Sequence, residues 1–180
     1  MPTWIALLRG INVVGHRVLP MSALAALLAR EGLQNVRTYI HSGNVVFQCS
    51  RGTPITLARR ISQLVLDHHG FQPQVIVLSD QDLIRAAAGN PFPEAEASPK
   101  ALHLFFLATS PRTPNLASLS RLRSGREAFE LRGKVFYLHT PDGFPASKLA
   151  ARAERLIGVA ATARNWRTVG RLVEIARDGG

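Results

Sequence analysis

The order in which strand-type and helix-type patterns follow one another restricts the fold of this chain more than any other feature. In the first half, apolar runs and helical spacing alternate in the order strand, helix, strand, strand, helix, strand. The segments are residues 4–8, 21–28, 36–40, 45–47, 53–70 and 75–78. The sequence His-Ser-Gly-Asn at 41–44 separates the two middle strands and is typical of a tight hairpin turn. This half therefore has the βαββαβ order of a ferredoxin-like unit.

The same order returns after a period of roughly 90 residues, without recognisable identity between the two halves. Its segments are residues 102–107, 113–122, 129–131, 135–138, 147–158 and 159–163, followed by a helical pattern over 169–176. We therefore predict an α+β protein of two tandem ferredoxin-like βαββαβ units, with mainly antiparallel sheets and a C-terminal helix. The expected domains are 1–90, which includes a trailing helix capped by Ser79, and 101–180, joined by a Pro-broken polar linker over 91–100.

Composition places the chain among globular proteins. Hydrophobic residues make up 46% and charged residues 19%, which supplies enough apolar surface for a core and argues against disorder. Cys49 is the single cysteine, so an internal disulfide and a Cys-rich zinc or iron–sulfur site are excluded. No apolar stretch approaches the ~20 residues that cross a bilayer, and the first residues lack the features of a secretory signal. We expect a cytoplasmic protein without membrane contact.

The chain is strongly basic, with 22 Lys and Arg against 12 Asp and Glu and a net charge of +10. Such a balance favours phosphate-bearing ligands or nucleic acid as partners. Nearly all of these cations are Arg, beside many Ala, so the codon bias of a GC-rich genome is a competing explanation. The densest cationic run, which is either a binding face or solvated surface, is Arg121, Arg123, Arg126, Arg132 and Lys134.

Two polar loops of the first half are candidate ligand-binding segments. Their candidate residues are Arg9, Asn12 and Arg17, with His16 nearby, and Ser42 and Asn44. Gly10 and Gly15 resemble a phosphate loop, but the Walker A Lys and the dinucleotide Gly-x-Gly-x-x-Gly pattern are absent. The alternative is that Asn12 and Gly10 only shape the turn. Because the first and second strands of a βαββαβ unit run parallel, we expect both loops at one end of the sheet.

The second half has candidate residues at strand ends as well, and these are Lys148, Arg164, Asn165 and Trp166. The Arg-Asn-Trp-Arg sequence at 164–167 joins two guanidinium groups to an aromatic plane that is able to stack on a base. A helix cap at Thr162 or Asn165 explains the same residues. Residues 132–137 are faintly similar to the RNP1 strand of RNA-recognition motifs, although Lys134 stands where an aromatic residue belongs, and an ordinary hairpin explains that run.

Five polar segments, spread in order over nearly the whole chain, form a recognisable set. They read Ala-Leu-Leu-Arg-Gly-Ile-Asn-Val at 6–13, Tyr-Ile-His-Ser-Gly-Asn-Val-Val-Phe at 39–47, Asn-Pro-Phe at 90–92, Ser-Lys-Leu at 147–149 and Thr-Ala-Arg-Asn-Trp-Arg-Thr at 162–168. Together they resemble the bacterial domain-of-unknown-function 1697 family. Two positions depart from the usual pattern of that family: Val14 stands before Gly15 in place of Gly, and His41 replaces Gln. The resemblance implies an α+β fold with ferredoxin-like elements and carries no settled biochemical role.

Catalytic and metal-binding motifs are scarce in this sequence. No Gly-x-Ser-x-Gly elbow occurs, and neighbours on a strand such as His41 and Ser42 point to opposite faces. No carboxylate falls within 9–17, 41–44 or 164–168, so acid–base chemistry by Asp or Glu is not expected there. The six His form no His-x-His or His-x-x-x-His pair, and we expect neither a metal nor a cofactor.

Three functions remain open on these observations. The first is binding of a phosphate-bearing small molecule or nucleic acid in a basic cleft, because Arg forks and amide donors match phosphate oxygens. The second is an enzyme that acts on a small anionic metabolite, with His41 or His16 as general base. The third is a structural or regulatory dimer that pairs through exposed sheet edges, so we expect a monomer or a homodimer.

A single cleft shared by both halves is the most specific expectation. If the two units pack about a pseudo-two-fold axis, the loop-bearing ends of their sheets face each other. The side chain of Arg9 or Asn12 then lies within roughly two side-chain lengths of Arg164 or Asn165, because loops at strand ends are free to converge on a ligand.

Overall fold

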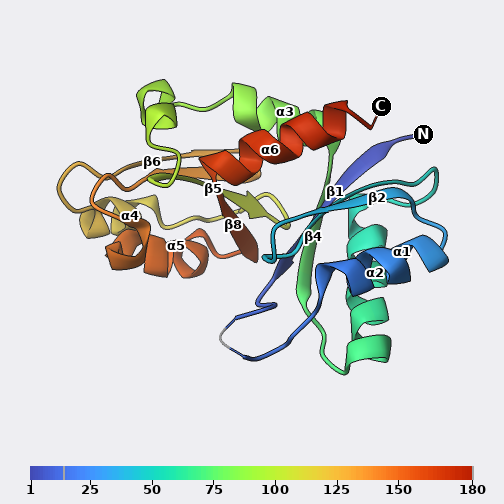
Figure 1. Ribbon diagram of the computed structural model, residues 1–180. Helices are drawn as coiled ribbons and strands as arrows, with labels where there is room; N and C mark the ends of the chain where they lie inside the picture. The colour runs from blue at the N-terminus through green and yellow to red at the C-terminus, as the bar shows by residue number, and fades with distance from the viewer. Residues whose placement is uncertain (14, 180) are drawn as a thin grey trace. The chain divides into compact units, whose positions relative to one another are not determined.

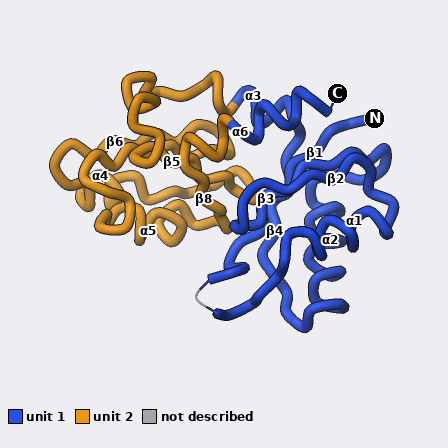
Figure 2. Tube along the Cα trace, in the orientation of Figure 1, with its two compact units in different colours: residues 1–85, 171–180 blue, residues 86–170 orange. Residues whose placement is uncertain are grey.

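The computed structural model describes residues 1–13 and 15–179, and it contains two four-stranded antiparallel sheets with helices (Figure 1). The βαββαβ order occurs twice along the chain, as the sequence predicted. Contacts divide the chain into two compact units: unit 1 is Met1–Arg85 with Arg171–Gly180, and unit 2 is Ala86–Gly170 (Figure 2). The α+β fold with two ferredoxin-like units is therefore confirmed.

The elements of unit 1 are β1 (Thr3–Arg9), α1 (Met21–Arg30), β2 (Gln34–Tyr39), β3 (Asn44–Gln48), α2 (Pro54–His69) and β4 (Gln74–Ser79). Its sheet has the order β2-β3-β1-β4, and each neighbouring pair is antiparallel. Because β3 lies between β1 and β2 and opposes both, β1 and β2 run parallel and end at the same side of the sheet. The loop after β1 and the turn after β2 therefore lie at one end of unit 1.

Local sequence signals explain where α2 begins and ends. Thr53 and Thr56 form a capping box, in which each hydroxyl accepts the other residue's backbone N–H, and Pro54 occupies the first turn. Gly70 ends the helix in the left-handed conformation. The core of unit 1 is one face of the sheet packed on α1 and α2. It includes Ala6, Leu8, Val45, Phe47, Val77, Leu24, Leu28, Leu57, Ile61 and Val65.

Unit 2 repeats the arrangement with its own elements, which are η1 (Pro93–Ala97), β5 (Leu102–Leu107), α4 (Leu116–Leu122), β6 (Ala128–Arg132), β7 (Val135–His139), η2 (Phe144–Ala146), α5 (Lys148–Ile157) and β8 (Ala161–Asn165). Its sheet has the order β6-β7-β5-β8 and is antiparallel throughout. The core includes Phe105 and Phe136, whose rings meet edge to face at 5.5 Å, with Leu119, Leu149 and Ile157 from α4 and α5.

Three boundaries differ from the sequence-based expectation. The helix α4 begins at Leu116 and not at 113, because Asn115 caps it by accepting the N–H of Ser118 at 2.9 Å. The last strand, β8, is Ala161–Asn165, so Arg164 and Asn165 lie within it and not after it. The linker expected over 91–100 contains the short 3-10 helix η1.

Two further helices carry the boundaries between the compact units. They are α3 (Asp80–Ala88) and α6 (Trp166–Arg177). Ser79 caps the N-terminus of α3, because its hydroxyl accepts the N–H of Asp82. The compact units therefore divide within α3 and α6. The sequence instead placed its domain boundaries on either side of the linker, and that division into independently folding domains stays a prediction.

Candidate functional site

Asn12 fastens the loop that follows β1 to the turn that follows β2. Its side-chain amide donates to the carbonyl oxygens of Leu19 at 2.9 Å and His41 at 2.8 Å, and its side-chain oxygen accepts the N–H of Leu19 at 2.7 Å. The backbone of Asn12 is left-handed, with φ 54°, a conformation that Asn tolerates better than most residues. Asn12 therefore holds the loop after β1 beside the turn after β2, as the topology predicted.

Gly43 brings the hairpin turn into direct contact with β1. Its carbonyl accepts the N–H of Leu8 at 2.8 Å, and its φ is +81°. A Cβ atom at this position would lie 2.8 Å from the Leu8 Cβ and 2.9 Å from the Ile11 Cδ1. Only glycine fits here, because both the backbone conformation and the space exclude a side chain.

Asn44 is fully buried, and its amide braces the same turn from inside. The side-chain nitrogen donates to the carbonyl oxygen of Tyr39 and to the hydroxyl of Ser42, each at 3.0 Å. The amides of Asn12 and Asn44 are thus both occupied in holding the turn together. For Asn12 the turn-shaping role that the sequence left open is therefore present in the structure, and Asn44 has a similar role.

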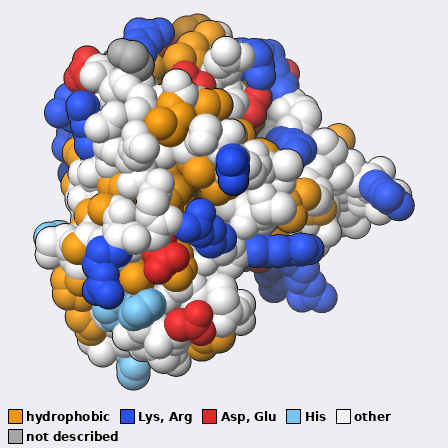
Figure 3. Space-filling model, turned by 90° about the vertical axis from the view of Figure 1, so that its right-hand side faces the viewer, with side chains coloured by type: hydrophobic (Ala, Val, Ile, Leu, Met, Phe, Trp, Pro, Cys, Tyr) orange, Lys and Arg blue, Asp and Glu red, His pale blue; other side chains and the backbone are white. Residues whose placement is uncertain are grey.

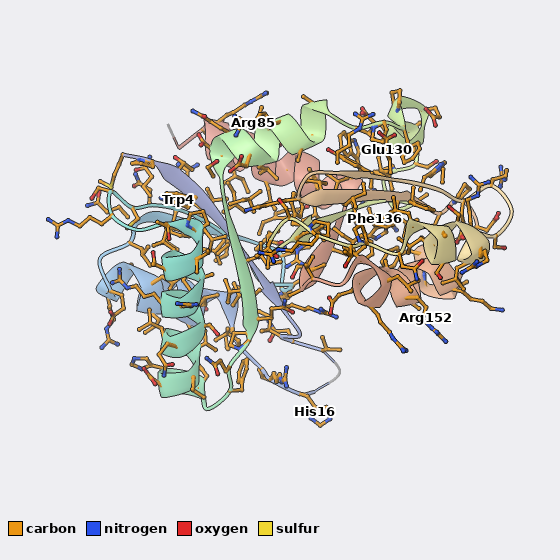
Figure 4. The ribbon with its side chains drawn as sticks, turned by 180° about the vertical axis from the view of Figure 1, so that it is seen from behind. Trp4, His16, Arg85, Glu130, Phe136 and Arg152 are labelled. Carbon is orange, nitrogen blue, oxygen red and sulfur yellow. The ribbon has the colours of Figure 1, made fainter. Side chains whose placement is uncertain are left out.

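Arg9 and Arg17 carry the positive charge of this loop pair. Arg9 is exposed and donates to the side-chain oxygen of Gln74 at 3.3 Å. Arg17 is exposed too, and its Nη1 lies 3.4 Å from the position that a Cβ on Gly10 would take. The guanidinium of Arg17 therefore folds back toward the residue next to Arg9. His16 points away from the sheet at the tip of the loop (Figure 4).

Arg164 occupies a different environment from the other cations. It is 9% exposed, lies in β8 opposite Leu104 of β5, and donates from Nη1 to the carbonyl of Ala163 at 2.9 Å. Burial lowers the pKa of its guanidinium to about 10. The group stays charged at neutral pH, and holding a buried charge in place requires acceptors around it.

The residues that follow Arg164 begin the last helix. Asn165 accepts the N–H of Thr168 at 2.9 Å through its side-chain oxygen, which is the geometry of a helix N-cap. Trp166, half-buried, is the first residue of α6, and its backbone N–H donates to the carbonyl of Pro99. Of the alternatives that the sequence left open, the cap is therefore present, and it is made by Asn165.

Lys148 is exposed and opens α5. The preceding Ser147 caps that helix, since its hydroxyl accepts the N–H of Ala150 at 3.0 Å. Because β7 and β8 both run antiparallel to β5, these two strands end at the same side of the unit 2 sheet. Lys148 follows β7 in the chain, and Arg164 lies near the end of β8.

His103 was not a site candidate in the sequence, because an isolated His in a strand has no distinguishing motif. Its ring stacks on Phe144 with centroids 3.7 Å apart, and it pairs in register with Asn165. The buried Nδ1 has no hydrogen-bond partner in the described part of the chain. Burial lowers the pKa of His103 to about 4, so the imidazole is neutral at physiological pH.

We expect the stability of the protein to fall as the pH drops from 6.5 toward 4, in part through His103. The unfolded His103 binds a proton in this range and the folded one does not, so acid favours unfolding by up to about 3 kcal/mol. In the variant His103→Phe, which keeps a ring against Phe144, this contribution should disappear. Urea unfolding of both proteins at neutral and acidic pH measures it; equal pH dependence in the two would contradict the burial of a neutral His103.

Two kinds of feature are not found in the described part of the chain. Among residues 1–13 and 15–179, no three His, Cys, Asp or Glu residues are grouped so that they could hold a metal ion. Over the same residues, no helix has both the length and the apolar character needed to cross a membrane.

Comparison with known proteins bears on the family and the fold. The family model described as "Protein of unknown function (DUF1697)" matches residues 1–137. The chain belongs to the DUF1697 family. A solved structure, that of the conserved bacterial protein SP0830 from Streptococcus pneumoniae, is similar with a TM-score of 0.68 and 21% identity, covering 97% of this chain and 98% of that one. No curated protein matches the sequence.

Several residues in the motifs that resemble DUF1697 have structural roles in this member. Asn12, Gly43, Ser147 and Asn165 make the turn and cap contacts described above. Asn90 likewise accepts the N–H of Phe92 and donates to its carbonyl. The segments at 147–149 and 162–168 lie beyond the matched residues. Of the two departures from the family pattern, Val14 lies outside the described residues, and His41 supplies the carbonyl that Asn12 holds.

The shared cleft stays a prediction. Arg9 and Asn12 belong to unit 1, whereas Arg164 and Asn165 belong to unit 2.

Proposed function

We propose that this protein binds a phosphate-bearing small molecule at the two loops of unit 1, with Arg9 and Arg17 as the charged contacts. The observation that carries the proposal is the conformation of Arg17. Its backbone is left-handed, with φ 53°, where an L-residue with a long side chain pays about 1 kcal/mol or more. Gly or Asn would be less strained at this position, so the presence of Arg here supports a role for its guanidinium.

The surroundings of Arg17 favour an anion as the ligand. The N–H of Asn12 donates to the Arg17 carbonyl at 3.1 Å, which fixes the backbone from which the side chain extends. No Asp or Glu occurs between residues 9 and 20 to neutralise the charge. In the part of the chain that the structure describes, no side-chain hydrogen bond or ion pair engages Arg17. Its planar fork suits two phosphate oxygens.

Binding is better supported than catalysis. A general base needs a partner that orients it, and in the described residues neither His16 nor His41 has a side-chain hydrogen bond; both are exposed. Dimerisation through the edge of β2 has less support, because a register irregularity between Gln34 and Arg37 interrupts that edge. We place the binding role in the cytoplasm, since the lone Cys49 suits a reducing compartment.

The variant Arg17→Asn should separate stability from binding. Asn tolerates the left-handed backbone, so the free energy of unfolding should stay equal or rise by up to about 1 kcal/mol, while phosphate affinity falls at least about tenfold. Isothermal titration with inorganic pyrophosphate, a nucleoside triphosphate and a sugar phosphate measures the affinity. Arg59→Gln, on the exposed face of α2, is the matched control and should leave it unchanged. Absence of binding by all three probes, or wild-type affinity in Arg17→Asn, would reject the proposal.

A further inference from the structure

The solvent-facing side of α5 carries a row of three cations, Lys148, Arg152 and Arg155, which we call the α5 ridge. The opposite side of the helix is buried through Leu149, Ala153 and Ile157. The ridge residues are spaced four and three positions apart, so they share one face of the helix. Arg152 points outward from α5 (Figure 4).

Almost no negative charge accompanies these cations. Across α4 and α5 the one acidic residue is Glu154, whose carboxylate accepts the N–H of Ala161 at 3.2 Å and so lies toward β8. Within residues 1–13 and 15–179, no hydrogen bond or ion pair is formed by the side chains of the ridge. Elsewhere on the surface, Lys and Arg side chains are interspersed with Asp and Glu, as on the face drawn in Figure 3.

The neighbouring helix α4 extends the positive surface. It packs against α5, and the N–H of Asn115 at its start donates to the carbonyl of Leu156 at the end of α5. Arg121 and Arg123 are exposed at the other end of α4. These two belong to the densest cationic run of the sequence. Two other members of that run are neutralised, since Arg126 pairs with Asp142 and Arg132 with Glu130.

We propose that the α5 ridge binds the phosphodiester backbone of nucleic acid without sequence preference. At a rise of 1.5 Å per residue the ridge spans about 10 Å, while one strand of B-form nucleic acid places a phosphate about every 3.4 Å along its axis. The ridge therefore reaches about three phosphates. Two of its cations are Arg, whose forks bind phosphate oxygens, and no aromatic side chain lies on it to stack on bases.

Other polyanionic partners fit this surface less well. Insertion into an anionic membrane needs large apolar side chains beside the cations, and the ridge offers only Ala151 between them. Leu116, 44% exposed at the start of α4, is the exposed large apolar residue of the two helices. An acidic protein would be expected to engage an aromatic or aliphatic anchor, which the ridge lacks. This surface lies in unit 2, so the inference is independent of the phosphate site proposed for unit 1.

Fluorescence anisotropy with mixed-sequence single-stranded RNA and duplex DNA tests the proposal. We expect binding at low salt, with log K falling against log salt at a slope between about −2 and −3. The double variant Arg152→Glu, Arg155→Glu should lose at least about tenfold in affinity. Glu is a good helix former, so α5 should persist, and circular dichroism checks it. If that variant does not fold, Arg152→Gln with Arg155→Gln takes its place.

A matched control changes the net charge equally but elsewhere. Arg30→Glu with Arg59→Glu alters exposed residues of α1 and α2 and should change nucleic-acid affinity by less than about threefold. Binding of either polymer with this salt dependence supports the proposal. The proposal is overturned if nucleic acid does not bind at low salt, if ridge and control variants lose affinity equally, or if only anionic vesicles or polyglutamate bind.

Discussion

Replacing Asn12 by alanine should lower the free energy of unfolding by about 2–4 kcal/mol. The change removes three hydrogen bonds, to the carbonyls of Leu19 and His41 and from the N–H of Leu19, each worth about 1 kcal/mol. It also places Ala in a left-handed backbone, which costs about 1 kcal/mol more than Asn. Urea unfolding followed by circular dichroism measures the loss.

A matched control for Asn12 is Asn35. Asn35 has a left-handed backbone too, with φ 50°, but its side chain makes one exposed hydrogen bond, to Gln48. Asn35→Ala should therefore cost only about 1 kcal/mol, mostly from the backbone. Equal losses in Asn12→Ala and Asn35→Ala would show that the loop is not fastened to the hairpin turn by Asn12. Asn12→Ala should also weaken phosphate binding, because the loop that carries Arg17 is then no longer held in place.

Gly43→Ala should destabilise the protein by about 3 kcal/mol or more. The new methyl group would meet the Leu8 Cβ at 2.8 Å and the backbone oxygen of Leu8 at 3.1 Å, so β1 and the turn must move apart. Such a movement also breaks the hydrogen bond from the Leu8 N–H to the Gly43 carbonyl. Thermal or urea unfolding gives the magnitude.

The hairpin of unit 2 supplies the comparison for Gly43. Gly133 also has a positive φ, +56°, but a Cβ there meets nothing within 4 Å. Gly133→Ala should therefore cost about 1 kcal/mol, from backbone strain alone. The difference between the two variants isolates the contact of Gly43 with β1. Similar losses in both would mean that the turn does not pack on Leu8.

The overall fold was predictable because its signals are local and repeated. The hairpin sequence at 41–44, the Thr53 and Ser147 caps, and Gly70 and Gly158 at helix ends act over a few residues. The strand and helix patterns between these turn and cap signals then predict the βαββαβ order. The start of α4 was misplaced because Pro114 and Asn115 both suit the beginning of a helix. In the structure the helix begins after Asn115, whose side chain caps it by accepting the N–H of Ser118.

The candidate site was only partly predictable. Asn12, Asn44 and Asn165 were recognisable from the sequence as candidate site residues. An Asn amide can bind a ligand or hold a turn equally well, and the contacts in the folded protein determine which role it has. The burial of Arg164 and the stacking of His103 depend on tertiary packing and leave no local pattern. The spacing of the three α5 cations was readable in the predicted helix, but tertiary packing decides whether acidic side chains neutralise them.

Amide chemical-shift mapping by NMR during titration with inorganic pyrophosphate tests the proposed phosphate site most directly. If the proposal is right, the shifts concentrate in residues 9–20 and 40–44, saturate with added ligand, and are strongly reduced in Arg17→Asn. The backbone of that variant should otherwise keep its wild-type spectrum, because Asn is tolerated at φ 53°. Saturating shifts confined to other segments, or no shifts in these loops at any concentration, would contradict a phosphate-binding role for Arg9 and Arg17.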